Sequence, residues 1–220
     1  MPFTTIPTEQ TTAITDLVLA AVSLACLRIL RGVRSSAPWK VDVWSWVLGL
    51  VAIAALLGTV AHGFQLDERL QDLIWQPIFL GLGLAIGLFV VAAVLDWRGV
   101  SAARKVLPIM LVVGVAFFAL TRIVRGTFLV FVLYEAVAML FALGLYGVLA
   151  ARRRLSGAAL VSVGIVLNMV GAAIQATESV TITLGVPFDH NGVFHLVQMV
   201  AVVVLTMGIR RGIKDVKGET

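Results

Sequence analysis

The three histidines of this 220-residue chain are the side chains best suited to do chemistry. His62 lies near the end of one apolar stretch, and His190 and His195 lie at the start of another. A neutral imidazole is a good zinc ligand, and three protein ligands with a fourth position left for water are typical of a catalytic zinc site. The sequence therefore predicts a zinc ion bound by His62, His190 and His195.

The elements that position these histidines are predicted to be membrane helices. Hydrophobic residues make up 60% of the chain, charged residues only 13%, and the mean hydropathy is +1.03, far from a soluble average. Stretches of about 20 apolar residues, the length that crosses a bilayer, cover residues 14–33, 41–64, 75–95, 106–124, 127–150, 157–177 and 192–209. None alternates with period two, as the strands of a transmembrane barrel do. We expect an all-α membrane protein, a single domain over residues 1–220 that forms a seven-transmembrane helix bundle.

The positive charges of the chain predict its orientation, because Lys and Arg are enriched on the cytoplasmic side of membrane proteins. Fourteen of the 17 Lys and Arg residues fall on the side that we assign to the cytoplasm, and only Arg69, Arg122 and Arg125 fall outside. No Lys or Arg precedes the first stretch, so we expect it to remain as an anchor and not to be a cleaved signal peptide. The predicted topology places the N-terminus outside and the C-terminus inside (N-out/C-in). The basic residues form short collars that face lipid headgroups, so we expect membrane lipids and no nucleic acid as partners.

The predicted orientation brings the histidines to one level of the bilayer. The second stretch runs from inside to outside and the seventh from outside to inside, so His62, His190 and His195 all lie near the outer surface. On a regular helix, residues five apart point roughly 140° away from each other. His190 and His195 can therefore bind one metal ion only if the helix begins between them. Residues favoured at helix starts, Asp189 and Asn191, permit such a beginning.

Further polar residues are predicted to support the histidines. Asn191 and His195 are four residues apart and share a helix face, which Gln198 continues. Asn191 is expected to hydrogen-bond a metal ligand or to replace one. Gln175, near the end of the sixth stretch, lies close to the same level. We expect Asn191, Gln198, Asp189 and Gln175 to surround the metal site.

Two polar residues lie deeper in the predicted bundle. Glu135 and Asn168 are on antiparallel stretches, each about 13 Å below the outer end by helix rise. Polar side chains that face lipid are unfavourable, so we expect these two to face inward and to pair. A structural hydrogen bond between helices is one interpretation of the pair, and a deeper polar pocket or proton relay is the other.

A carboxylate must handle the proton when a metal-bound water reacts. Asp72, just before the third stretch, and Asp67 are the candidates for a general base or for a residue that positions the water. The alternative interpretation is that both are solvated loop charges.

Three features of the chain resemble those of a known family. They are the segment Gly58-Thr59-Val60-Ala61-His62-Gly63-Phe64, the acidic residues ahead of the third stretch and the paired histidines of the seventh stretch. They are similar to the CREST superfamily of seven-helix membrane hydrolases, which groups alkaline ceramidases with adiponectin and progestin receptors. The resemblance implies that the three histidines hold zinc, assisted by an aspartate near helix three and a serine one turn before the first histidine. Gly58 stands in place of that serine, which leaves Thr59 as the nearest hydroxyl, and the paired histidines are five residues apart where the family has four. Two interpretations of these departures are open: a divergent branch with a shifted ligand, or a superficial likeness. The His-Asn-x-x-x-His opening of the last stretch resembles that of bacterial membrane proteins, so we expect a location in the inner (plasma) membrane.

The predicted function is zinc-dependent hydrolysis of an amide or ester bond by metal-activated water. The outer level of the histidines favours a lipid-like substrate that enters sideways and keeps its chain among the helices. One alternative is electron transfer by a haem bound between His62 and His195. Another is a non-enzymatic sensor, receptor or transporter in which the histidines are structural or respond to pH.

Overall fold

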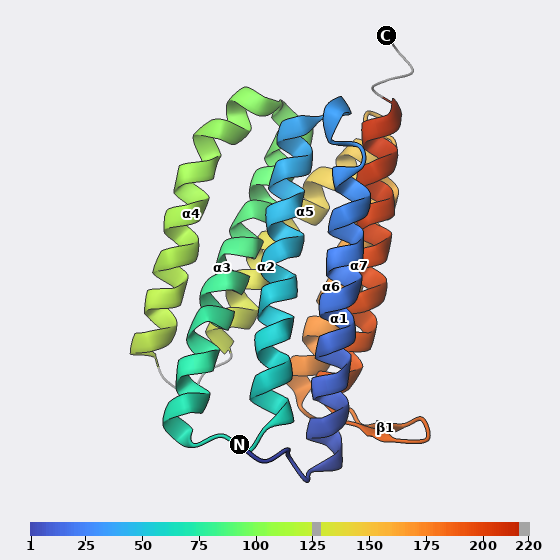
Figure 1. Cartoon of the computed structure of the whole chain (residues 1–220). Helices are drawn as coiled ribbons and strands as arrows, with labels where there is room; N and C mark the ends of the chain where they lie inside the picture. The colour runs from blue at the N-terminus through green and yellow to red at the C-terminus, as the bar shows by residue number, and fades with distance from the viewer. Residues whose placement is uncertain (125–128, 216–220) are drawn as a thin grey trace.

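The chain forms long α-helices that run alternately up and down (Figure 1). The computed structural model describes residues 1–124 and 129–215. The elements in chain order are α1 (Pro7–Arg31), the 3-10 helix η1 (Arg34–Ser36), α2 (Pro38–Gly63), α3 (Glu68–Arg98), α4 (Val100–Ile123), α5 (Leu129–Ala151), α6 (Ala158–Thr177), the antiparallel strands β1 (Ile182–Thr183) and β2 (Pro187–Phe188), and α7 (His190–Asp215). Seven helices of the described residues are long and apolar enough to cross a membrane. The predicted all-α, seven-helix architecture is therefore confirmed, and the first residues of the predicted stretch 127–150 lie outside the described part.

Several helices extend beyond the apolar stretches that predicted them, because capping residues and not hydropathy set their ends. α1 begins seven residues earlier than predicted, with Pro7 in its first turn, where a missing N–H costs nothing. α3 begins at Glu68 after Asp67, whose side chain accepts a hydrogen bond of 2.8 Å from the Leu70 backbone N–H. Gly99, with a φ of +82°, makes the tight turn between α3 and α4. The longer α1 places polar residues of the N-terminal segment on a helix inside the bundle.

The helices pack as a ring with one helix outside it. α1 contacts both α2 and α7, which closes the ring, whereas α4 packs almost entirely against α3 (Figure 1). Small residues permit that contact: a Cβ on Gly83 would lie 3.1 Å from the Gly114 carbonyl oxygen, and one on Gly87 would lie 2.8 Å from the Met110 carbonyl oxygen. Most of the α4 surface is consequently exposed.

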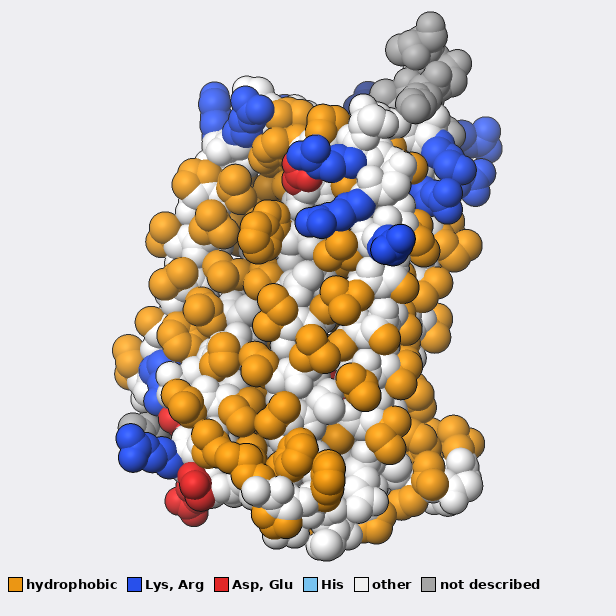
Figure 2. All heavy atoms as spheres, viewed as in Figure 1, with side chains coloured by type: hydrophobic (Ala, Val, Ile, Leu, Met, Phe, Trp, Pro, Cys, Tyr) orange, Lys and Arg blue, Asp and Glu red, His pale blue; other side chains and the backbone are white. Residues whose placement is uncertain are grey.

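Charged side chains gather near the ends of the bundle. Figure 2 shows Lys and Arg side chains concentrated at the end where α7 finishes, and apolar side chains covering the flank between the two ends. Arg122 and Asp72 form an ion pair at the opposite end. The apolar flank and the charged ends match the surface of a helical bundle that sits in lipid.

Candidate functional site

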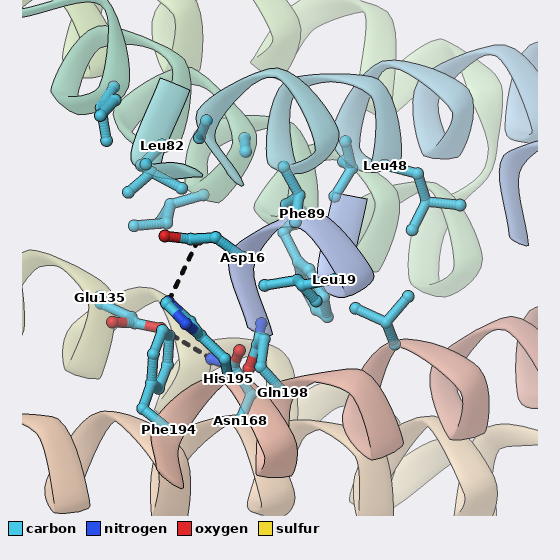
Figure 3. Close-up of a pocket in the computed structure, with 18 of the residues that line it drawn as sticks. Asp16, Leu19, Leu48, Leu82, Phe89, Glu135, Asn168, Phe194, His195 and Gln198 are labelled. Atoms are coloured by element: carbon cyan, nitrogen blue, oxygen red, sulfur yellow. Dashed lines mark hydrogen bonds and ion pairs between the residues drawn. The ribbon is translucent and has the colours of Figure 1, made fainter. Parts of the chain in front are cut away.

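A cavity of about 160 Å³ lies between α1, α2, α3, α5, α6 and α7. Most of its lining is apolar, but one end gathers polar side chains from five of these helices (Figure 3). The polar lining residues near that end are Asp16, His62, Glu135, Asn168, Gln175, Asn191, His195 and Gln198. The structure therefore brings His62 and His195 to the same cavity, as the depth argument predicted.

Asp16 on α1 lies at the centre of the polar end. Its side chain is buried, with only 4% of the residue exposed, and it packs against Gly58 on α2. A Cβ atom on Gly58 would lie 2.5 Å from Asp16 Oδ2. Gly58, which stands where the family resemblance implies a serine, thus leaves the space that the Asp16 carboxylate occupies.

His195 on α7 is held by two residues of α1. Its Nδ1 lies 3.0 Å from Thr15 Oγ1, and its Nε2 lies 3.3 Å from Asp16 Oδ1. The single hydroxyl proton of Thr15 is donated to the Thr12 carbonyl at 2.9 Å, so Thr15 accepts a hydrogen bond from His195 Nδ1–H. His195 Nε2 then faces a carboxylate oxygen within ion-pair distance. Asp16 and His195 therefore form a buried carboxylate–imidazole pair.

His62 on α2 has a carboxylate partner of its own. Its Nδ1 lies 2.7 Å from Glu9 Oε2, and its ring meets the Trp75 ring edge-on at a centroid distance of 5.7 Å. Glu9 and Asp16 are both on α1, seven residues apart, so one face of α1 supplies a carboxylate to each histidine.

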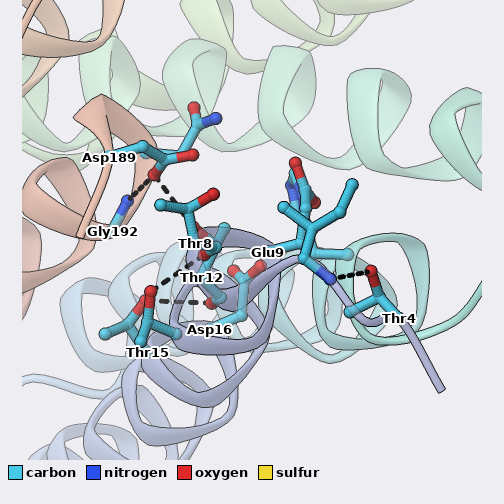
Figure 4. A network of polar contacts seen from close by, with 12 residues as sticks. Thr4, Thr8, Glu9, Thr12, Thr15, Asp16, Asp189 and Gly192 are labelled. Atoms are coloured by element: carbon cyan, nitrogen blue, oxygen red, sulfur yellow. Dashed lines mark hydrogen bonds and ion pairs between the residues drawn. The ribbon is translucent and has the colours of Figure 1, made fainter. Parts of the chain in front are cut away.

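The start of α7 differs from the arrangement that a shared metal requires. Asp189 is the N-cap: its Oδ1 accepts hydrogen bonds from the Gly192 backbone N–H at 2.9 Å and from Thr12 Oγ1 at 3.0 Å (Figure 4). The helix consequently begins at His190, not after it, and His190 and His195 lie on one continuous helix with their side chains roughly 140° apart. His190 lines a second, outer cavity of about 630 Å³ that His62 also lines.

The described residues do not fit the predicted zinc site. Zinc bound tetrahedrally at 2.0–2.2 Å keeps neighbouring ligand atoms roughly 3.3 Å apart, and His195 Nε2 and Asp16 Oδ1 have that spacing. A third ligand is missing: within residues 1–124 and 129–215, no group of three or more His, Cys, Asp or Glu side chains is placed to hold a metal ion. Zinc binding by His62, His190 and His195 stays a prediction.

The predicted catalytic residues lie away from the Asp16–His195 pair or have other roles. Asp72 is 57% exposed, lines the outer cavity and accepts two hydrogen bonds from the Arg122 guanidinium, at 2.8 and 3.1 Å. Asp67 caps α3, and Thr59 donates to the Ala55 carbonyl at 3.0 Å. Neither Asp67 nor Thr59 is among the described residues that line the two cavities.

Three of the four predicted supporting residues, Asn191, Gln198 and Gln175, line the polar end, whereas Asp189 caps α7. Asn191, His195 and Gln198 share one face of α7 and line the cavity, and Gln175 Nε2 donates to Asn191 Oδ1 at 3.2 Å. The predicted pairing of Glu135 with Asn168 is confirmed, because Asn168 Nδ2 donates to Glu135 Oε1 at 2.7 Å.

Sequence reasoning missed the contribution of α1. Asp16 falls inside the predicted apolar stretch 14–33, where an ionisable residue is by default a candidate for function. A second signal was the spacing of Thr8, Thr11, Thr12 and Thr15, which repeats at three and four residues and marks a polar helix face. Figure 4 shows this face turned toward Asp189 at the start of α7.

Fold and site together define an all-α protein of seven long helices that encloses a carboxylate–imidazole pair at the polar end of an apolar cavity. The chain belongs to a family of unknown function, DUF6962, whose model matches residues 11–214. A comparison with curated proteins found no match, and a comparison with solved structures found none either.

Proposed function

We propose that this protein is an integral membrane protein, with its N-terminus outside and its C-terminus inside, that binds a lipid-like amphiphile in the cavity between its helices. The topology is supported by the basic residues at the end of the bundle where α7 finishes and by the length and apolar character of the seven described helices. The binding proposal rests on one observation, the separation of polar and apolar lining along the cavity.

The shape of the cavity favours a chain-like ligand. On α2 the lining extends from Trp44, toward the inner end, to His62 at the outer end. Eighteen helical residues correspond to about 27 Å. The volume of about 160 Å³ spread over that length makes the cavity narrow. An alkyl chain along the apolar part and a polar headgroup beside Asp16 and His195 match this lining.

The Asp16–His195 pair provides acid–base chemistry beside the headgroup. In this proposal the pair acts as a general base that takes a proton from a water molecule as the water oxygen attacks the carbonyl carbon of an ester or amide headgroup. The pair then returns that proton to the leaving oxygen or nitrogen as the C–O or C–N bond breaks. Thr15 orients the imidazole by accepting the hydrogen bond from Nδ1. No step is assigned to zinc, because a third ligand is missing from the described residues.

A cavity-filling substitution tests the binding proposal. Ala85 on α3 lines the cavity and is 5% exposed, so we expect Ala85→Leu to displace the alkyl chain and to weaken binding of a fluorescent fatty alcohol by about tenfold or more. Val112→Leu adds a methylene group at an exposed position of α4 and is the matched control. The measurement is the affinity of wild type and both variants for the fluorescent fatty alcohol, obtained by titration in detergent. Size-exclusion chromatography verifies that each variant is folded. Equal affinity of all three proteins, or no binding by wild type, would contradict the proposal.

A further inference from the structure

Apart from His62 and His195, which lie against Glu9 and Asp16, the charged residues that line the cavity have a single sign. Asp16 and Glu135 line it, and no Lys or Arg is among the described residues that do. The outer cavity, which shares His62, Trp75 and Gln175 with the first one, continues the same sign with Glu68 and Glu178. The path from the outer surface to the polar end is therefore lined by carboxylates, and it favours a cationic headgroup over an anionic one.

Glu135 is a cavity-lining carboxylate that has no charged partner among the described residues. It projects from α5 into the cavity and receives one hydrogen bond, from the neutral amide of Asn168 at 2.7 Å (Figure 3). The histidines bind other groups: His62 lies against Glu9, and His195 lies against Asp16. A carboxyl group inside an apolar bundle is neutralised by protonation unless a cation lies nearby, so a bound cation would stabilise its ionised form. A bound ligand can supply that cation.

Aromatic rings line the approach to Glu135. Trp75, Phe79 and Phe131 line both cavities, with ring centroids 5.8 Å apart for the first pair and 6.5 Å apart for the second. Phe131 is one turn before Glu135 on the same face of α5. The faces of such rings attract an ammonium group, whereas they give a carboxylate no comparable stabilisation.

We propose that the amphiphile carries a protonated amine, whose ammonium group binds Glu135 at the polar end of the cavity while its alkyl chain extends toward Trp44. This inference rests on the proposed function, because it specifies the headgroup of the same ligand. Asp16 and the aromatic rings of Trp75, Phe79 and Phe131 complete the surroundings of the ammonium group.

Three ligands of equal chain length test the headgroup: dodecylamine, dodecanol and dodecanoate, titrated into the full-length protein in a non-ionic detergent by calorimetry. We expect wild type to bind the amine about tenfold more tightly than the alcohol, a difference of ~1.4 kcal/mol, and to bind dodecanoate most weakly. Glu135→Gln keeps the size of the side chain and an oxygen for Asn168, and it should remove the preference for the amine while dodecanol binding stays unchanged.

Asp42→Asn is the matched control, because Asp42 is an exposed carboxylate at the inner end that pairs with Arg34. This variant should keep the preference of wild type. If dodecanol or dodecanoate binds wild type as tightly as the amine, or if Glu135→Gln retains the preference, the amine inference is wrong while the proposed function stands. If none of the three ligands binds wild type, both fail.

Discussion

The two ends of the bundle bury ionisable groups in different ways. At the end where α7 finishes, the inner end of the proposed topology, Asp96 on α3 receives hydrogen bonds from Lys40 Nζ at 2.6 Å and from the Tyr146 hydroxyl at 2.9 Å. The side chains of Lys40 and Asp96 are 11% and 6% exposed, so the ion pair is nearly shielded from water and each charge compensates the other. At the end where α7 begins, the outer end of the proposed topology, Asp16 forms a pair with His195, and Glu135 has only an amide partner among the described residues.

This comparison separates charges that hold helices together from charges that are available to a ligand. Lys40 and Asp96 neutralise each other and tie α2 to α3. The carboxylates at the outer end line a cavity and lack a Lys or Arg among the described residues around it. Burial alone does not identify a binding site, whereas burial beside a cavity with incomplete charge compensation does.

The largest effect is expected from breaking the inner pair. Lys40→Met leaves Asp96 buried without its cation, so the free energy of unfolding in detergent should fall by about 3–5 kcal/mol. Arg34→Met removes the cation of the exposed Arg34–Asp42 pair and should change stability little. Denaturant unfolding of both variants measures the difference, and ligand binding at the outer end should persist in each. Similar stability of the two variants would show that the inner pair does not hold the helices together.

A smaller effect is expected from crowding the outer pair. Gly58→Ala places a methyl group 2.5 Å from Asp16 Oδ2, so the carboxylate must shift from its position beside His195 or the helices must separate slightly. We expect the free energy of unfolding to fall by about 1–3 kcal/mol and affinity for the amphiphile to decrease. Gly49→Ala on the same helix is the control, because its Cβ would meet the Leu27 side chain at an ordinary 3.7 Å. In an Asp16→Ala background the cost of Gly58→Ala should largely disappear. An unchanged cost there would mean that the two residues do not interact.

Removal of a helix N-cap should lower the free energy of unfolding by about 1 kcal/mol. It should weaken ligand binding only when the capped helix carries a residue of the candidate site. Asp189→Ala removes the N-cap of α7, which carries His195, and Asp67→Ala removes the N-cap of α3. Both variants should lose similar stability in thermal unfolding, but only Asp189→Ala should weaken ligand binding. Equal binding by the two variants would argue against a role for the start of α7 in positioning His195.

The smallest effect is expected on metal content. Because the described residues offer His195 and Asp16 as neighbouring ligand atoms but no third ligand, we expect purified wild type, His62→Ala and His195→Ala to contain similarly little zinc by elemental analysis. One zinc per wild-type chain, lost in His195→Ala and in Asp16→Asn, would restore the metal prediction with Asp16 in the place predicted for His190.

Much of the fold could be predicted because hydropathy over about 20 residues is a local property of the sequence. The seven stretches correspond to seven helices, although α1 and α3 begin seven residues earlier, at Pro7 and Glu68. The error at α1 had a consequence for the site. A stretch that begins at residue 14 leaves Asp16 at its edge, whereas a helix that begins at Pro7 carries Glu9 and Asp16 on one face.

The candidate site was only partly predictable. The shared level of His62 and His195 followed from alternating helix directions, and the pairing of Glu135 with Asn168 followed from equal depth. Depth does not specify which helices are neighbours around the ring. The contact of α1 with both α2 and α7 decided that Glu9 and Asp16, rather than His190, lie beside the two histidines.

The amino-acid sequence by itself determined the helical class, the number of long apolar helices and the height of each polar side chain, because these depend on composition and on 1.5 Å of rise per residue. The tertiary structure alone decided which polar groups meet, because that depends on the rotation and neighbours of each helix. It paired His195 with Asp16, turned His190 to another cavity and left Glu135 facing the apolar interior with one amide partner.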